Sequence, residues 1–126
     1  MTPLGAKLRA LREERGVTLK EMAKALNVSS AYLSALEHGR RGKPTWYLLQ
    51  RIIAYFNVIW DEAEELQRLA ELSDPKVTID TGGLPPEATE LTNRLQKEIG
   101  RLAPEDLAFL RNEVIRRSAA KRETGR

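Results

Sequence analysis

The residues of this chain best suited to chemistry are short polar side chains followed by a cluster of positive charges. Hydroxyl groups occur at Ser29, Ser30 and Ser34, and the sequence Arg-Arg-Gly-Lys at residues 40–43 carries three cations. Hydroxyls donate and accept hydrogen bonds, and guanidinium and ammonium groups bind anionic oxygen atoms. This combination predicts non-covalent recognition of an anionic partner.

The composition argues against catalysis. The 126-residue chain has one histidine and no cysteine, and it shows neither a glycine-rich phosphate loop nor paired carboxylates in an apolar setting. We therefore expect no enzyme, no metal site and no cofactor. The lack of cysteine and of an apolar signal segment indicates a cytoplasmic location, and no run approaches the roughly 18 apolar residues of a membrane span.

The charge is unevenly distributed along the chain. Residues 1–57 carry ten Lys/Arg and four Asp/Glu, residues 58–72 carry one and five, and residues 73–126 carry ten and nine. The net charge of +3 therefore arises in the N-terminal part, where it can meet phosphate groups. A solvated surface with no partner is the alternative explanation of the same pattern.

Five N-terminal helices are predicted to position these side chains. Leucines spaced by four and three residues give the first helix its apolar face. Thr18 and Glu21 have the spacing of a capping box, and hydroxyl caps at Ser29 and Thr45 predict the starts of two more helices. The five helices are expected over about residues 3–15, 19–26, 30–38, 46–56 and 60–72.

The sequence changes character after Leu72. Asp-Pro, Gly-Gly and Pro-Pro pairs predict a linker, with a possible short strand at residues 77–79. Beyond it, apolar residues repeat at intervals of three and four, and Pro86 and Pro104 stand where helices start. The expected divisions are a domain over 1–72, a linker over 73–86, a helical region over 87–120 and a frayed tail over 121–126.

One spaced pattern runs through the second and third helices: Thr-x4-Ala-x4-Val-Ser-x3-Leu-Ser-x-Leu-Glu-x-Gly. It is filled by Thr18, Ala23, Val28, Ser29, Leu33, Ser34, Leu36, Glu37 and Gly39. The pattern resembles the helix-turn-helix of the phage repressor and Cro family, often called the XRE family. The resemblance covers about residues 4–72. It implies an all-α fold, with a five-helix repressor-like DNA-binding domain and a C-terminal two-helix extension.

The resemblance also implies where DNA would bind. The third helix of such domains enters the major groove, so the base-facing positions are Ser30, Ala31, Ser34 and Ala35. Such short side chains make few discriminating contacts, and specificity is expected to depend also on the cations at 40–43, on DNA shape or on half-site spacing. The expected contacts to phosphate or flanking groups are Thr18, Lys20, Ser29, Tyr32, His38, Arg40, Arg41 and Lys43.

Two further positions follow from the resemblance. Arg12 on the first helix is expected to pair with Glu37 at the end of the third, which would fix the recognition helix. Leu19 departs from the family, because many members carry a phosphate-binding glutamine there. The contact with phosphate then depends more on the other residues named above.

The ring-bearing residues allow two interpretations each. Tyr32 is suited either to a phosphate or thymine-methyl contact or to a half-buried position. His38 is expected to be an ordinary exposed residue unless it contacts phosphate. Trp46 and Trp60 begin helices and are expected to cover the core rather than to stack on bases.

These features favour a sequence-specific transcriptional regulator, expected to be a repressor. Its expected location is the cytoplasm, in association with a bacterial or phage nucleoid. The regulator would bind double-stranded DNA at a palindromic operator as a homodimer. The alternatives are an antitoxin-type regulator whose C-terminal region binds a toxin or another protein, and C-terminal helices that fold back on the fifth helix. The predicted dimerisation residues are Leu91, Leu95, Ile99, Leu102, Leu107, Leu110 and Val114.

Overall fold

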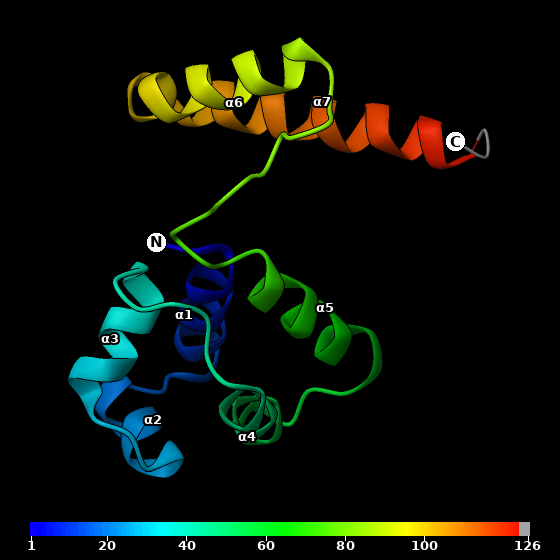
Figure 1. Cartoon of the computed structure of the whole chain (residues 1–126). Coiled ribbons are helices and arrows are strands. Elements are labelled where there is room, and N and C mark those ends of the chain that lie inside the picture. The colour runs from blue at the N-terminus through cyan, green and yellow to red at the C-terminus, as the bar shows by residue number, and fades with distance from the viewer. Residues whose placement is uncertain (124–126) are drawn as a thin grey trace. The chain divides into compact units, whose positions relative to one another are not determined.

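The computed structural model describes residues 1–123 and contains helices but no strand in that range (Figure 1). The predicted all-α class is therefore confirmed. The chain divides into two compact units between Thr78 and Ile79. This division lies beyond the expected domain end at Leu72, because Ser73 is buried within the first unit.

Five helices form the first unit, and three of them start at the caps predicted from the sequence. The Thr18 hydroxyl accepts a hydrogen bond from the Glu21 amide, and the Glu21 carboxylate accepts one from the Thr18 amide, both within 3.0 Å. Ser29 and Thr45 cap their helices in the same way. The helices are α1 (Pro3–Arg15), α2 (Leu19–Leu26), α3 (Ser30–His38), α4 (Trp46–Phe56) and α5 (Trp60–Glu71).

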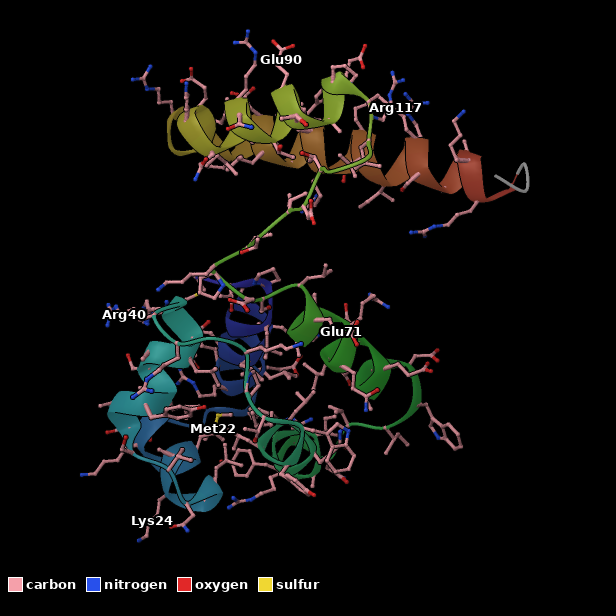
Figure 2. The ribbon with its side chains drawn as sticks, in the orientation of Figure 1. Met22, Lys24, Arg40, Glu71, Glu90 and Arg117 are labelled. Carbon is pink, nitrogen blue, oxygen red and sulfur yellow. The ribbon has the colours of Figure 1, made fainter. Side chains whose placement is uncertain are left out.

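One apolar core joins these five helices. In Figure 1, α1 lies between α3 and α5, while α2 lies against α3 and α4. Figure 2 shows the Met22 thioether pointing into the space that these helices enclose. The buried apolar residues are Leu4, Leu8, Leu11, Met22, Ala23, Leu26, Leu33, Leu36, Leu48, Leu49, Ile52, Phe56, Val58, Leu66 and Ala70.

The two tryptophans were expected in this core, and that expectation is wrong. Trp46 is 64% exposed and Trp60 is 81% exposed. Trp46 is the first residue of α4, and the buried positions of that helix begin at Leu48 and Leu49. At the junction of α4 and α5, Val58 is the residue that is buried in the core.

The buried Ser73 ties the end of the first unit to its beginning. Its hydroxyl accepts from the Leu4 amide over 2.9 Å and donates to the Leu69 carbonyl over 2.5 Å. The first amides of a helix have no partner within that helix, so the bond from Ser73 satisfies a donor that α1 cannot satisfy itself. The chain therefore leaves the first unit from a point fixed against α1.

No strand forms in the linker, so the expected strand at residues 77–79 is wrong. These residues have extended backbone and are exposed, and no segment among the described residues pairs with them. A strand requires a neighbour to satisfy its backbone groups, and alternating side chains alone do not supply one.

The second unit contains α6 (Pro86–Glu98), a short 3₁₀ helix η1 (Ile99–Arg101) and α7 (Pro104–Glu123). In Figure 1, α6 and α7 run in opposite directions. We call the segment that contains them and η1 the C-terminal helix pair. Residues 121–123, at the start of the expected frayed tail, are helical, and residues 124–126 lie outside the described residues. Glu113 stabilises this helix through bonds from Arg116 and Arg117, which lower the pKa of its carboxyl.

Candidate nucleic-acid interface

The third helix presents two chemically different sides. Leu33, Leu36 and Glu37 are buried against the rest of the first unit. The opposite side, which we call the α3 face, has two exposed residues followed by two half-buried ones. Its members are Ser30, Ala31, Ser34 and Ala35, the four predicted base-facing residues.

An ion pair fixes α3 to α1. Arg12 donates from Nε to Oε2 of Glu37 over 2.9 Å and from Nη2 to Oε1 over 3.2 Å. Glu37 is 1% exposed, and this double contact satisfies both of its carboxylate oxygens. The hydrogen bond to Glu37 raises the pKa of the Arg12 guanidinium. Planar two-point contacts of this kind restrict orientation as well as distance, so α3 is held in one direction.

A glycine allows α1 and α3 to approach each other this closely. A Cβ atom added to Gly5 would lie 2.1 Å from the carbonyl oxygen of Glu37. No real side chain tolerates that contact with backbone. Gly5 therefore sets the spacing between α1 and the C-terminal end of α3, and it was not identified from the sequence.

Two predicted contact residues, Thr18 and Ser29, have their hydroxyls engaged as helix caps. Each oxygen accepts a bond from a backbone amide three residues later. A hydroxyl that accepts in this way retains its own hydrogen for donation. Both side chains are exposed, so this donor faces solvent at the starts of α2 and α3.

The predicted cations lie on the elements that precede and follow α3. Lys20 is exposed on α2, and Arg40, Arg41 and Lys43 are exposed in the segment from residue 40 to 43, which we call the basic loop. Figure 2 shows Arg40 beyond the C-terminal end of α3 and Lys24 at the far end of the α2 and α3 pair. Lys24 is also exposed and extends the set of cations beyond those predicted.

Negative charge lies on a different side of the first unit. The acidic residues of α5 border an open hollow on that helix, and they are Asp61, Glu62, Glu64 and Glu65. In Figure 1 α5 is separated from α3 by α1. The first unit therefore has a basic side around α3 and an acidic side on α5, which orients it toward a polyanion.

Two ring-bearing residues of α3 make specific contacts. The guanidinium carbon of Arg41 lies 5.4 Å from the centre of the Tyr32 ring, and Tyr32 is half-buried against the core. His38 is exposed, and its Nδ1 donates to the Ser34 carbonyl oxygen over 2.8 Å. The contact between Tyr32 and Arg41 was not predicted, although both residues were.

Among residues 1–123 no group of three or more His, Cys, Asp or Glu side chains is arranged to hold a metal ion. The geometry described so far is that of two short helices, α2 and α3, joined by a tight turn with Asn27 in the left-handed conformation. The sequence family described as helix-turn-helix domain matches residues 3–69. The chain belongs to the helix-turn-helix domain family.

Curated relatives share this helix-turn-helix region. The uncharacterized HTH-type transcriptional regulator RghRB of Bacillus subtilis (strain 168) is 34% identical over 61 residues, which is 48% of this chain and 44% of the relative. The HTH-type transcriptional repressor RghR of the same organism is 48% identical over 44 residues, or 35% and 33% of the two chains. The aligned parts thus span less than half of either relative.

A third relative and one solved structure extend the comparison. The HTH-type transcriptional regulator DdrOP3 of Deinococcus deserti is 42% identical over 52 residues, 41% of this chain and 40% of the relative. A chain of the SinR protein/SinI protein complex is 24% identical with a TM-score of 0.42, over 91% of this chain and 98% of that chain. The relatives are named as transcriptional regulators, not as enzymes, which agrees with the expectation from composition.

The predicted dimerisation residues lie outside the helix-turn-helix region, on the C-terminal helix pair. Five of the seven side chains are exposed, and Leu95 and Leu102 are half-buried. Phe109 and Ile115 on α7 are also exposed and add apolar surface that the predicted set omitted. The five exposed members are Leu91, Ile99, Leu107, Leu110 and Val114.

No helix among the described residues is long and apolar enough to cross a membrane.

Proposed function

We propose that this protein is a transcriptional repressor that binds a palindromic operator as a homodimer, with α3 of each copy in the major groove. The observation that carries the proposal is the α3 face, a surface of small side chains bordered by exposed cations on a helix held rigidly by Arg12 and Glu37. A helix without bulky residues approaches base edges closely, and the cations neutralise phosphates. Such a protein acts in the cytoplasm, on the nucleoid.

The names of the relatives support regulation and, for RghR, repression. The chain aligns with only part of each relative, so the operator and the direction of regulation rest on this proposal. Contacts with phosphate or with groups that flank the contacted bases are assigned to the hydroxyl, cationic and ring-bearing side chains around the α3 face. They are Thr18, Lys20, Ser29, Tyr32, His38, Arg40, Arg41 and Lys43.

The homodimer is proposed because the C-terminal helix pair has no core of its own. None of the side chains described in residues 79–122 is buried, although the pair carries many large apolar residues. A two-helix segment becomes stable when it buries an apolar face against another element. A second copy supplies the same face, as a two-fold symmetric interface requires.

The balance of charge in the C-terminal helix pair also allows a second copy to approach. Residues 79–123 contain eight Lys/Arg and eight Asp/Glu, so this segment has no net charge. Several of these charges pair within one helix, for example Arg94 with Glu90 and Arg116 with Glu113. Two copies of the C-terminal helix pair can therefore approach each other without net repulsion.

The mass of the full chain in solution tests the dimer. Sedimentation equilibrium is expected to give twice the chain mass for the wild type and a lower mass for Leu110→Asp, which places a charge within the predicted stripe. Ile59→Asp is the matched control, because Ile59 is an exposed apolar residue of the first unit. A dimer that survives Leu110→Asp and Val114→Asp together would contradict the assignment of these residues.

A second candidate function uses the same exposed residues. An antitoxin-type regulator would cover its C-terminal helix pair with a toxin or another protein partner instead of a second copy. The mass of the purified chain in solution distinguishes the two proposals. Under the antitoxin proposal the chain is a monomer by itself and forms a stoichiometric complex with its partner. A purified homodimer that binds a palindromic duplex alone favours the plain regulator over this second candidate.

A further inference from the structure

The α3 face by itself lacks a side chain that distinguishes one base pair sharply from another. Its serines and alanines offer single hydrogen bonds or methyl contacts, whereas strong discrimination comes from two-point contacts such as arginine on the O6 and N7 atoms of guanine. A regulator with this face needs a long donor side chain held beside it. The basic loop contains three long side chains that carry suitable donors.

The three cations of the basic loop have different surroundings in the structure. The guanidinium carbon of Arg41 lies 5.4 Å from the centre of the Tyr32 ring. Among the described residues, Arg41 is the one cation of the basic loop that contacts an aromatic ring. Tyr32 belongs to α3 and is packed against the core, so its ring has a fixed position relative to the α3 face. Arg40 and Lys43 extend from the same loop as exposed side chains.

The contact with Tyr32 suits Arg41 to base recognition. A guanidinium over an aromatic ring uses its charge and its flat face, and its N–H groups still point outward in the plane of the group. An ordered side chain also loses less freedom on binding than one that moves in solvent. A side chain held in this way is suited to enter a groove together with α3, because its donors are already oriented.

We propose that Arg41 is the specificity-determining side chain of the interface, recognising a guanine beside the α3 face, and that Tyr32 is the positioning residue that holds it. This inference rests on the proposed DNA-binding function. It assigns different roles to two adjacent arginines of equal charge. Arg41 contributes to the choice of sequence, and Arg40 contributes to affinity for any DNA.

Binding measurements on the full chain test this assignment. Duplexes are first selected from a randomised pool by the wild-type protein, and dissociation constants are then measured for a selected duplex and a scrambled duplex at one salt concentration. Arg41→Ala is expected to reduce the ratio of the two affinities by about tenfold or more. Arg40→Ala is the matched control and is expected to weaken both duplexes by the same factor. Arg41→Lys keeps the charge and is expected to lose most of the ratio, because an ammonium cannot make the two-point contact.

The role of Tyr32 is tested by a double-mutant cycle. Tyr32→Leu is expected to reduce the affinity ratio, and adding Arg41→Ala to it is expected to reduce the ratio no further than Arg41→Ala alone. Tyr32→Phe retains the ring and is expected to restore the ratio. A thermal unfolding curve for each variant separates loss of specificity from loss of fold.

Two results would overturn these claims at different levels. If Arg41→Ala weakens both duplexes equally, as Arg40→Ala does, Arg41 binds phosphate and the specificity assignment is wrong while the DNA-binding function stands. If the wild type enriches no sequence from the pool, sequence-specific binding itself is wrong.

Discussion

Arg12 on α1 forms an ion pair with Glu37 on the buried side of α3, with Nε of Arg12 2.9 Å from Oε2 of Glu37. The carboxylate is almost fully buried and the guanidinium nearly so, since their side chains are 2% and 12% exposed. Water cannot replace either partner at this depth. The direction of α3, and so of the α3 face, depends on this pair.

Removing one partner of this pair is expected to be costly. Glu37→Gln or Arg12→Met leaves a buried group without its counter-charge and is expected to lower the free energy of unfolding by about 3 kcal/mol or more. The double variant Arg12→Met/Glu37→Gln is expected to lose less than the sum of the two single changes. Urea denaturation of the four proteins measures this, and strictly additive losses would show that the pair is not coupled.

Gly5 is expected to tolerate no side chain. Gly5→Ala places a Cβ against the Glu37 backbone, so α1 and α3 must separate, with a loss of roughly 1–3 kcal/mol and weaker DNA binding. Gly42→Ala is the control, because a Cβ there has no atom within 4 Å. Thermal unfolding of both variants checks the loss of stability, and DNA affinity is compared between Gly5→Ala and the wild type, because Gly42 lies in the basic loop. Equal effects of the two changes would mean that close helix contact is not what requires glycine at position 5.

Ser73→Ala is expected to destabilise the first unit although it removes a single oxygen atom. The Leu4 amide loses its partner in a buried position, and the cost of an unsatisfied donor is about 1–3 kcal/mol. Ser118→Ala provides a control, since that hydroxyl bonds within its own exposed helix. The same bond predicts that a fragment ending at Thr78 is more stable than one ending at Leu72, which chemical denaturation of both fragments can measure.

The capping box of α2 is expected to depend on pH. The Thr18 amide, and after it the Thr18 side chain, lowers the pKa of the Glu21 carboxyl in the folded state. A lowered folded pKa gives stability that is present above the unfolded pKa and is lost as the pH falls through the folded pKa. The difference in unfolding free energy between wild type and Glu21→Gln is therefore expected to shrink from neutral to acidic pH. Glu14→Gln, an exposed change on α1, controls for the loss of one negative surface charge.

The helices of this protein could be predicted well from the sequence because many of their ends are set by interactions between residues close together in the chain. Thr18, Ser29 and Thr45 cap helices through bonds that span three residues, and Asn27 and Asn57 end helices in the left-handed conformation. Such signals need no knowledge of the rest of the fold. The family pattern added the position of the α3 face and the partner of Arg12, which no local rule supplies.

Features that depend on distant parts of the chain were missed. Ser73 contacts Leu4 across 69 positions, and nothing near Ser73 in the sequence indicates it. Trp46 and Trp60 were misplaced because local periodicity does not show that Leu48 and Val58 already fill the core. Gly5 left one signal, since a glycine inside a helical pattern is unfavourable and points to a close contact.

The central claim is that this protein recognises a palindrome as a dimer through α3, and equilibrium binding of the full chain to duplexes selected from a randomised pool tests it most directly. The predicted result is enrichment of an inverted repeat, bound by two chains per duplex, with an affinity that falls as salt concentration rises. Enrichment of no sequence, or binding of one chain to a site without two-fold symmetry, would contradict it.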